Sequence, residues 1–494
     1  MLLNKTHFNN RYIKLGDGFY VSTLPVQSAD PTLIIFNEGL ATELDLLETD
    51  FNLGDKASLF SGNLMAAGAE PLAMAYSGHQ FGYFSPQLGD GRALLLGEIE
   101  TIDGRSLSVQ LKGSGRTFFS RNGDGRSALG PVLREYLLSE AMAKLGVPTT
   151  RALAAVTTGE QVVRQQLLPG GVITRIATSF VRVGTFQYFA SRGEGESIRQ
   201  LADYVIESDY PFVREDESPY LALLNAVIER QAALIAKWMS FGFIHGVMNT
   251  DNMSIAGETI DYGPCAFMDA FSHNKVFSSI DREGRYAYYN QPAIGLWNLT
   301  RLAESLVPLL ADDVEPAVDI AKQALEKYMP LYEQYWLTGM RDKLGLSIEQ
   351  VGDKELVDEL LDIMASNRAD FTLTFYYLSQ LDFDSEAQDS LIQPLFVEDE
   401  GFNQWVKKWR HRLAKENISN DLRRKNMRAV NPVYIPRNHQ VEAAIRAAED
   451  EDDFSVFHKL HQVLQNPYEF QRGQEVYMQA PEEHEIVRQT FCGT

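Results

Sequence analysis

The amino-acid sequence predicts an α+β protein with two lobes and a mostly helical C-terminal region. Three observations predict this class: a glycine-rich turn that opens two apolar strands, a long amphipathic helix from about Tyr220 to Gly242, and helical periodicity beyond residue 345. A chain of 494 residues is also too long for one ordinary core. We expect four parts: an N-terminal extension packed on the first lobe (1–75), a first lobe (76–190), a second lobe (191–340) and a helical C-terminal region (341–494).

Composition narrows the possible partners. Hydrophobic residues at 45% and aromatic residues at 11% indicate a folded globular protein. The 45 basic and 67 acidic residues give a net charge of −22, which argues against nucleic acid or an anionic membrane as the partner. No apolar run is long enough to span a membrane, and the N-terminus resembles neither a signal nor a transit peptide. We therefore expect a cytoplasmic protein.

The first lobe begins with a turn that has the composition of a phosphate-binding loop. Gly89-Asp90-Gly91-Arg92 opens an apolar strand, Ala93 to Ile99, and a turn at Asp103-Gly104 leads into a second strand that ends at Lys112. Glycines permit close backbone approach to phosphates, and a lysine supplies a point charge. Taken singly, such a turn is more often a plain turn, and such a lysine is usually solvated.

A helix carries the expected partner of that lysine. Residues Pro131 to Leu145 have Pro in the first turn, apolar residues at helical spacing, and the stop signals Gly146 and Pro148. The helix contains Glu135. In protein kinases a strand lysine pairs with a glutamate on the following helix, so Glu135 is the candidate partner of Lys112.

Two further features supply charge to the first lobe. A second Gly-Asp-Gly-Arg sequence, at 123–126, contributes Asp124 and Gly125, and the two loops are placed to flank one polyphosphate. Gln161 to Leu168 and Val172 to Ala177 are predicted to form a hairpin around Pro169-Gly170-Gly171. Arg175 and Arg182 alternate with apolar residues, which puts both on one face, where they are able to clamp anionic oxygens. Surface charge is the commoner role for any single arginine.

The second lobe contains the residues on which the chemistry depends. After the Tyr220 to Gly242 helix come His245, Asp251, Asn252 and Asp261. Met253 to Ile260 is predicted to form two short strands, which would put Asn252 and Asp261 side by side at the open end of a hairpin. An amide oxygen beside a carboxylate suits a hard divalent cation that keeps several waters and binds nucleotide phosphates. The alternative is a buried turn in which the Asp and Asn side chains cap backbone amides.

This order of parts predicts a bilobal protein-kinase-like fold. Protein kinases place HRDxxxxN before a hairpin and DFG after it, and here the offset from His245 to Asn252 is kept, with Asp261-Tyr262-Gly263 as the second motif. The position of the kinase base is Val247, which cannot accept a proton. A different carboxylate, Asp251, precedes the metal asparagine. The site is therefore either inactive or performs another reaction.

Beyond the second motif the chain is predicted to be helical. Asn290 to Leu310 and Val314 to Tyr335 have helical patterns, and about 345 to 494 is mostly helical with acidic runs. No motif in this last part indicates chemistry by itself, and a helical region covering the surface is the expected role.

The motifs together resemble the selenoprotein O (SelO) family of kinase-fold protein adenylyltransferases. The resemblance covers residues 10–335 and 431–442, and it rests on specific motifs: GHQFG (78–82), two GDGR loops, VQLKGSG (109–115), LREYL (133–137), HGVMNTDNMS (245–254), IDYGPCAFMD (260–269), NQPAIGLWNL (290–299) and NPVYIPRNHQVE (431–442). Members of this family look like pseudokinases because the kinase base is absent. They bind ATP in a flipped orientation and move AMP onto protein hydroxyls.

The resemblance implies a role for each matching residue. Lys112, Arg175 and Arg182 would hold the β- and γ-phosphates, aided by Asp124 and Gly125, and Glu135 would orient Lys112. Asn252 and Asp261 would hold Mg²⁺, with Mn²⁺ able to replace it, and Asp251 would accept the proton. The nucleotide would also contact Gly89, Gly91 and Arg92.

The expected activity is transfer of AMP from ATP to Ser, Thr or Tyr hydroxyls of proteins, the enzyme itself included, with release of pyrophosphate. If Lys112 and two arginines hold the β- and γ-phosphates at the buried end of the cleft, the exposed phosphorus is the α and pyrophosphate leaves. Three alternatives stay open: uridylylation with UTP, a conventional protein kinase that uses Asp251 as a displaced base, and a non-catalytic nucleotide-binding scaffold.

The chain has two cysteines, and their positions predict redox control. Cys265 lies two residues after Gly263, and Cys492 is the third residue from the end, where many members of the resembled family carry selenocysteine. A reversible Cys265–Cys492 bridge would tie the tail across the mouth of the cleft. The alternative is two unrelated thiols that stay reduced.

Overall fold

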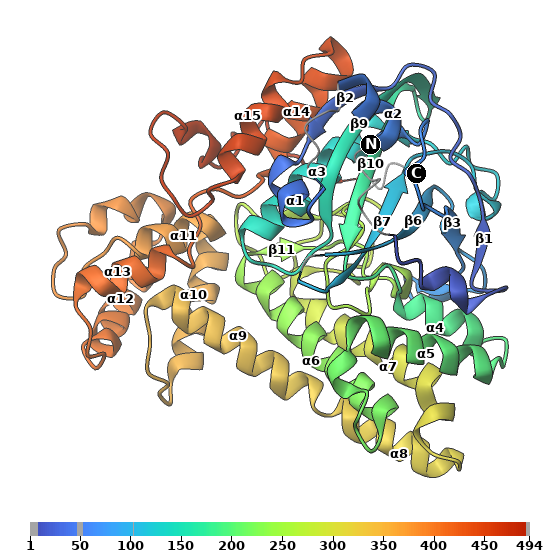
Figure 1. Ribbon diagram of the computed structural model, residues 1–494. Coiled ribbons are helices and arrows are strands. Elements are labelled where there is room, and N and C mark those ends of the chain that lie inside the picture. The colour runs from blue at the N-terminus through green and yellow to red at the C-terminus, as the bar shows by residue number, and fades with distance from the viewer. Residues whose placement is uncertain (1–7, 47–52, 102, 491–494) are drawn as a thin grey trace.

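The computed structural model describes residues 8–46, 53–101 and 103–490, and its fold is α+β (Figure 1). The main sheet has eight strands in the order β1-β3-β6-β7-β10-β9-β2, with β8 paired to β10, and every pair is antiparallel. Its strands are β1 Tyr20–Ser22, β2 Thr32–Phe36, β3 Leu72–Met74, β6 Ala93–Glu100, β7 Ser106–Lys112, β8 Ser127–Ala128, β9 Arg151–Val163 and β10 Leu167–Ala177.

The sheet places Lys112 centrally. In the registers of β6 with β7 and of β10 with β7, Lys112 is opposite both Ala93 and Ile173. The predicted strands on either side of the Asp103-Gly104 turn are therefore confirmed. Residues before 76 supply β1, β2 and β3, so the N-terminal segment forms both edges of this sheet.

Helices cover both faces of the sheet. α1 (Glu38–Glu43) and α2 (Leu53–Ser61) enclose one apolar cluster, and α3 (Leu129–Lys144) lies against β9 and β10 on the other side. The predicted helix Pro131 to Leu145 corresponds to α3. Almost all of α3 is buried, charged residues included, so each buried charge needs a partner. Glu140 meets Arg151, for example, with Nη2 to Oε2 at 2.9 Å.

A layer of helices lies below the sheet and packs around α6 (Figure 1). The predicted helix beginning near Tyr220 is α6. The largest apolar cluster runs from α3 through this layer into the C-terminal helices, so these parts share one core. The helices of the layer are α4 Val183–Ala190, α5 Gly195–Asp209, α6 Pro219–Ser240, α7 Gln291–Leu310, α8 Val314–Leu325 and α9 Tyr328–Leu344.

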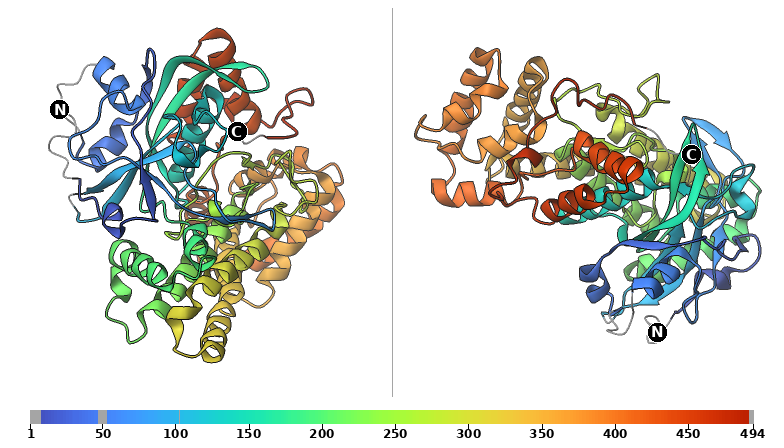
Figure 2. Two further views of the ribbon diagram at one scale, coloured as in Figure 1. Left: turned by 90° about the vertical axis from the view of Figure 1, so that its right-hand side faces the viewer. Right: turned by 90° about the horizontal axis from the view of Figure 1, so that it is seen from above.

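The C-terminal region is helical, as predicted. Its first four helices project to one side of the molecule, while α14 and α15 return to lie against α3 (Figures 1 and 2). Contacts at α3 include the Gly130 amide donating to Glu449 Oε1 at 2.8 Å and the Tyr468 hydroxyl donating to the Leu145 carbonyl at 2.9 Å. The six helices are α10 Asp353–Asn367, α11 Phe371–Leu378, α12 Asp399–Leu413, α13 Asn420–Arg428, α14 Asn438–Glu451 and α15 Ser455–Leu464.

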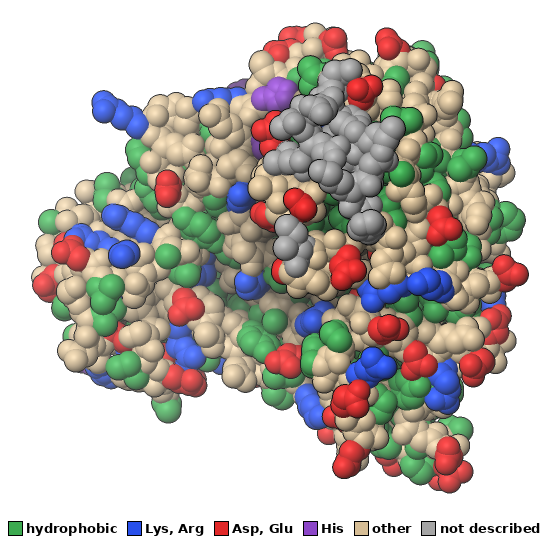
Figure 3. Space-filling model, in the orientation of Figure 1, with side chains coloured by type: hydrophobic (Ala, Val, Ile, Leu, Met, Phe, Trp, Pro, Cys, Tyr) green, Lys and Arg blue, Asp and Glu red, His purple; other side chains and the backbone are tan. Residues whose placement is uncertain are grey.

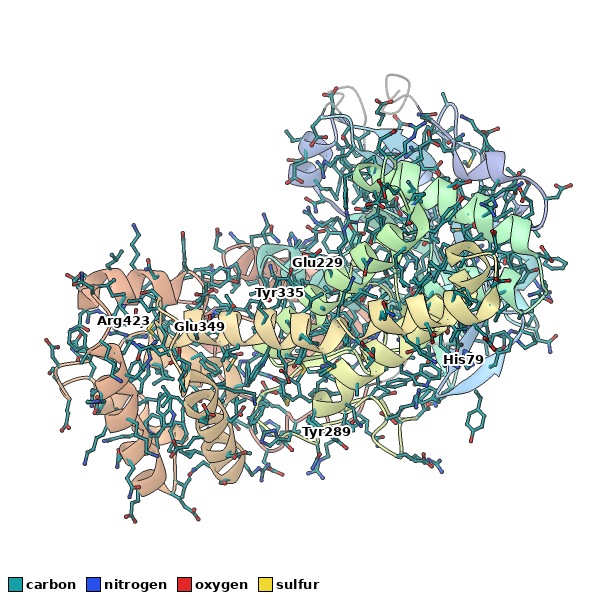
Figure 4. The ribbon with its side chains drawn as sticks, turned by 90° about the horizontal axis from the view of Figure 1, so that it is seen from below. His79, Glu229, Tyr289, Tyr335, Glu349 and Arg423 are labelled. Atoms are coloured by element: carbon teal, nitrogen blue, oxygen red, sulfur yellow. The ribbon has the colours of Figure 1, made fainter. Side chains whose placement is uncertain are left out.

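Helix α9 connects the helical layer to this projecting group (Figure 4). Its Tyr335 hydroxyl donates to Glu229 Oε1 of α6 at 3.0 Å, and near its end Arg341 Nη1 pairs with Glu349 at 3.0 Å. The sequence pattern from Val314 to Tyr335 predicted one helix, which is wrong, because α8 ends at Leu325 and α9 begins at Tyr328. Pro330 explains the break, since proline is tolerated in a first turn but not inside a helix.

The predicted hairpin around Pro169-Gly170-Gly171 exists, but its turn was misplaced. The chain reverses at residues 164–166, where the Arg164 amide donates to the Gln166 carbonyl at 2.9 Å. Pro169 to Gly171 lies inside β10, at an irregularity in its pairing with β9. A bulge accommodates proline within a strand, and a turn prediction based on Pro-Gly-Gly misses this possibility.

The predicted hairpin Met253 to Ile260 is also wrong. Both halves pair elsewhere: the Ile255 amide donates to the Val181 carbonyl at 2.9 Å, and the Thr259 amide donates to the Pro148 carbonyl at 2.9 Å. Segments at Pro148 and Val181, distant in the sequence, therefore take the hydrogen bonds that a local hairpin would have used. Asn252 and Asp261 still line the same cleft.

Two small sheets complete the described fold. β4 (Gly78–Gln80) and β5 (Tyr83–Ser85) form a separate hairpin, and β11 (Phe243–Ile244) pairs with β12 (Ala266–Phe267) on either side of the loop that follows α6. Acidic and basic side chains are interspersed on the face shown in Figure 3. Within the described residues, no helix has both the length and the apolar character needed to cross a bilayer.

Candidate active site

A cleft of about 1020 Å³ gathers the predicted site residues. One wall comes from the sheet, α3 and the two Gly-Asp-Gly-Arg loops, and the other comes from residues 247–252 and 261–263. Twelve residues predicted for nucleotide, metal or proton transfer line it, although they come from segments far apart in the sequence: Gly89, Gly91, Arg92, Lys112, Asp124, Gly125, Glu135, Arg175, Arg182, Asp251, Asn252 and Asp261.

The predicted lysine–glutamate pair is present. Lys112 Nζ lies 2.7 Å from Glu135 Oε2 and 2.9 Å from Asp261 Oδ1. Lys112 is the last residue of β7, and Glu135 lies in the second turn of α3, so strand end and helix meet at this pair. Both side chains are buried, which strengthens their attraction relative to a surface pair.

Two arginines complete a group of three cations that surround Asp261. Lys112, Arg175 and Arg182 are hereafter called the cation cluster. Arg175 Nη1 lies 3.0 Å from Glu135 Oε1 and 2.8 Å from Asp261 Oδ1. Arg182 Nη2 lies 3.4 Å from Asp261 Oδ2. Burial alone would raise the pKa of Asp261, but Lys112, Arg175 and Arg182 together hold it well below its usual value. Asp261 is therefore a permanent anion at neutral pH.

Sequence reasoning missed two residues behind this cluster. Asp90 Oδ1 lies 3.5 Å from Arg182 Nη1, and Gln110 Oε1 accepts from Arg175 Nε at 3.1 Å. Burial raises the pKa of Asp90, and Arg182 and Arg175 oppose that rise. Gln110 was detectable in principle, because it precedes Lys112 by two residues on a strand and so shares its face.

The charges in this part of the cleft balance without a ligand. Three cations face three carboxylates, those of Glu135, Asp261 and Asp90. A polyphosphate entering the cleft would compete with Asp261 for the same cations. Such an exchange of one anion for another is possible without leaving a buried charge unpaired.

One glycine in each Gly-Asp-Gly-Arg loop is required by close packing. Gly89 has φ of +77°, and a Cβ there would lie 2.2 Å from the Phe119 ring. Gly125 has φ of +69°, and its Cβ would lie 2.2 Å from the Gly115 carbonyl oxygen. Close approach between loops therefore explains both residues, whatever the cleft binds. At the rim Asp124 pairs with Arg164, Oδ2 to Nη1 at 2.8 Å.

His245 has a structural role in the opposite wall. Its Nε2 donates to the Ile260 carbonyl at 2.9 Å, and its ring lies on Trp238. Burial lowers the pKa of His245, so the neutral ring is favoured. The hydrogen bond fixes the residue before Asp261, whose φ of +61° is unusual outside glycine and marks a conformation that the surroundings enforce.

Asp251 and Asn252 occupy a short 3-10 turn, Thr250–Asn252. Gln80 Nε2 donates to Asp251 Oδ2 at 3.1 Å, while Asp251 Oδ1 is buried and lacks a hydrogen-bond partner within the described residues. Burial raises the pKa of Asp251 to about 6, opposed by the Gln80 hydrogen bond. A carboxylate of this kind is suited to accept a proton near neutral pH.

The donor set fits a hard divalent cation. Asn252 Nδ2 donates to the Val247 carbonyl at 3.1 Å, which leaves the amide oxygen for another partner, and Asp251 and Asp261 line the same cleft. Among described residues, no three His, Cys, Asp or Glu side chains form a metal site. Asn252, waters and nucleotide oxygens would have to complete the coordination, as Mg²⁺ sites commonly require.

The structure describes one cysteine of the predicted pair. Cys265 is fully buried, and its carbonyl accepts from Arg134 Nη2 at 2.5 Å. Cys492 lies outside the described residues. The nearest described part of the tail, Thr490, donates through its hydroxyl to the Pro264 carbonyl at 2.5 Å.

Comparison with known proteins identifies the family. The sequence model of the family described as "Protein adenylyltransferase SelO" matches residues 2–465. The chain belongs to the SelO family. Its curated relatives include proteins named "Protein nucleotidyltransferase YdiU" from Rhizobium etli (strain CIAT 652), 55% identical over 99% of this chain and 97% of that protein, and from Rhizobium meliloti (strain 1021), 56% identical over 99% of both chains. A relative of the same name from Agrobacterium fabrum is 54% identical over 99% of both chains.

Membership of the SelO family makes the chain a nucleotidyltransferase. The resemblance noted in the sequence is thereby confirmed at the level of family and enzyme class, and the scaffold alternative is excluded. In this SelO protein the cleft already described is the candidate site for the transfer.

Proposed function

We propose that the protein transfers AMP from ATP to Ser, Thr or Tyr hydroxyls of proteins, itself included, and releases pyrophosphate. The observation that carries this proposal is the separation of two kinds of charge in one cleft. The cation cluster gathers three buried cations at one wall, and Asp251 provides a proton acceptor at the other. The printed name of the matching family, a protein adenylyltransferase, supports AMP and protein acceptors.

The cation cluster suits the β- and γ-phosphates. With those two groups held by Lys112, Arg175 and Arg182, the α-phosphorus lies toward Asp251. The hydroxyl oxygen bonds to the α-phosphorus, the bond from that phosphorus to the bridging oxygen breaks, and the hydroxyl proton passes to Asp251. Pyrophosphate leaves with its charge stabilised by the same three cations.

Asn252 and Asp261 would hold Mg²⁺, with Mn²⁺ as a possible replacement. When bound, the ion neutralises phosphate charge and orients the phosphate oxygens. Asp261 becomes available for this role when the phosphates replace it as the partner of Lys112 and the arginines. Glu135 would keep its contact with Lys112 and so orient it toward the phosphates.

Val247 is consistent with a protein-kinase-like bilobal fold that lacks kinase activity. Val247 lines the cleft at the position of the kinase base, and its side chain cannot accept a proton. We propose that phosphoryl transfer is lost for this reason and that the chain is a pseudokinase. We retain the four-part division at residues 75, 190 and 340, a cytoplasmic location and protein rather than nucleic-acid substrates as parts of this proposal.

ATP labelled at the α- or the γ-phosphate tests the proposal. Wild type should attach the α-label to protein, Asp251→Ala should do so only at a small residual rate, and neither should attach the γ-label. Val247→Asp should still fail to transfer the γ-phosphate, because the flipped nucleotide buries it away from residue 247. Appearance of γ-label on protein would instead support a conventional kinase. Incorporation from labelled UTP under the same conditions, in excess of that from ATP, would favour uridylylation.

A further inference from the structure

The β4–β5 hairpin holds the loop that carries Asp251. Although it precedes this loop by 171 residues, the His79 amide donates to Thr250 Oγ1 at 2.7 Å. The Phe81 amide donates to Asn249 Oδ1 at 3.1 Å, and the Tyr286 hydroxyl donates to the same oxygen at 2.6 Å. Backbone of the first lobe thus fixes the turn of the second lobe that precedes the metal asparagine.

The hairpin also confines the Asp251 side chain. A Cβ at Gly78 would lie 2.8 Å from Asp251 Oδ1 and 3.1 Å from the Asp251 amide nitrogen. On another side, a Cβ at Gly184 would lie 3.3 Å from Asp251 Cα and 2.1 Å from the Ser77 carbonyl oxygen. Glycine at both positions therefore lets two backbones approach this residue closely.

Within this confined space, Gln80 is the one side-chain donor to the Asp251 carboxylate among the residues that the structure describes. Its Nε2 lies 3.1 Å from Oδ2, while Oδ1 lies against Gly78 without a partner. Gln80 and Asp251 both line the cleft. One hydrogen bond therefore sets the rotation of the carboxylate, and a proton acceptor must be held within a narrow range of geometry to act.

We propose that Gln80 is a positioning residue for the transfer reaction: it holds the carboxylate of Asp251 in the orientation that receives the hydroxyl proton. This inference rests on the proposed role of Asp251. Gln80 acts through Asp251 and is assigned no contact with the reacting atoms.

If the hairpin had a purely structural role, a variant that loosens it elsewhere would lower the transfer rate as much as a variant at Gln80. His79 also anchors the hairpin (Figure 4). Gln187 Nε2 lies 2.9 Å from His79 Nδ1, and the Trp297 ring lies edge-on to the imidazole, with 5.1 Å between ring centroids. Gln187→Met removes the amide contact to the hairpin without touching Asp251. It is therefore the matched control for Gln80→Met, which removes the amide donor and keeps the side-chain length.

The experiment measures single-turnover transfer of α-labelled AMP, nucleotide Kd and thermal unfolding of the full chain. Gln80→Met should lower the transfer rate about 10- to 100-fold, with nucleotide Kd and unfolding temperature near those of wild type. Gln80→Glu should lower it further, because a second carboxylate would repel Asp251. Gln187→Met should stay within about twofold of wild type, since the control leaves Asp251 in place.

A double-mutant cycle decides whether Gln80 acts through Asp251. In an Asp251→Ala background, Gln80→Met should have no further effect on the residual rate. An undiminished rate in Gln80→Met, an equal loss in Gln187→Met, or additive losses in the double variant would overturn the inference. Failure of wild type to transfer α-label would instead contradict the proposed function, so the two failures are distinguishable.

Discussion

Asp251 and Asp261 lie in one cleft, ten residues apart, in opposite surroundings. Asp261 meets three cations: Lys112 Nζ at 2.9 Å, Arg175 Nη1 at 2.8 Å and Arg182 Nη2 at 3.4 Å. Asp251 meets one neutral amide, from Gln80, and has one buried oxygen without a partner. The pKa of Asp261 is far below its usual value, and burial raises the pKa of Asp251 to about 6.

The difference assigns the two carboxylates to different chemistry. A group held ionised by three cations serves as a fixed charge, whereas a group disfavoured in its ionised form by burial is ready to take a proton. Pairs of titratable groups whose surroundings separate their pKa values are a mark of active sites. The predictions below test that separation.

Asp261→Asn should have the largest effect, on both activity and stability. The variant leaves three buried cations with one carboxylate fewer, so we expect a loss of roughly 3–5 kcal/mol in the free energy of unfolding. Transfer should fall by at least about 10³-fold, because the metal loses its only charged ligand of the proposed pair. Denaturant unfolding and α-label transfer measure the two effects.

Asp103→Asn is the matched control for this loss. Asp103 pairs with Arg105 at 2.7 Å, and both side chains are more than half exposed. The same substitution there should leave the free energy of unfolding almost unchanged, because water screens an exposed pair. A small effect at Asp261 as well would show that the cation cluster does not depend on it.

Asp251→Asn should raise the free energy of unfolding, whereas Asp261→Asn should lower it. With an unfolded pKa of 3.8 and a folded pKa of about 6, the native state holds the proton more tightly between these values, so stability falls as pH rises through that window. Above it the full cost of the buried charge remains. In metal-free protein near about pH 7.5, the Asn variant should gain on the order of 1–3 kcal/mol in unfolding free energy.

Below about pH 4 the gain should vanish, because both states of the wild type then carry the proton. Unfolding at the two pH values gives the comparison within one pair of proteins. Transfer by the variant should fall about 10²- to 10⁴-fold. An Asn variant that is less stable than wild type near pH 7.5 would mean that a cation pairs with Asp251 after all.

Sequence reasoning located the elements that local patterns determine. The strand that ends at Lys112, the helix with Glu135 and the helix that ends just before Gly242 all follow from apolar periodicity with glycine and proline at the ends. The resemblance then placed twelve residues that line one cleft. These features are local in the chain or carried by motifs.

What sequence reasoning missed depends on distant partners. The segment 253–260 has the alternation of a hairpin, yet residues 148 and 181 take its hydrogen bonds. Gln80 and Asp90 stand within quoted motifs, but their partners, Asp251 and Arg182, follow by 171 and 92 residues. No local pattern encodes such a contact, and propensity yields to tertiary pairing.

Lys112→Met tests whether Asp261 is able to bind a divalent cation. Without nucleotide, Lys112 competes with a divalent cation for Asp261 Oδ1, so removing its charge should tighten Mn²⁺ binding by about tenfold. Transfer should nevertheless fall, since the phosphates lose a cation. Titration of nucleotide-free protein with Mn²⁺, followed by electron paramagnetic resonance, measures the affinity. Lys408→Met, at an exposed pair with Glu359, should leave it unchanged, and equal affinities in all three proteins would contradict the competition.

The smallest expected effect concerns the tail beside Asp261. Thr490 is held to the segment that follows this aspartate: its amide donates to the Phe277 carbonyl at 2.9 Å, and the Ser279 amide donates to its carbonyl at 3.1 Å. A Cys265–Cys492 bridge would fasten the tail here and limit movement of residues up to Ile280, which lines the cleft. Closing so long a loop should stabilise the tethered state by about 2–5 kcal/mol.

Reduction should then raise the transfer rate a few-fold in wild type and leave that of Cys492→Ser unchanged. Peptide mapping of the oxidised protein should recover the Cys265–Cys492 crosslink. A Cys492→Ser variant that responds to reductant as wild type does would mean that the two cysteines are independent thiols.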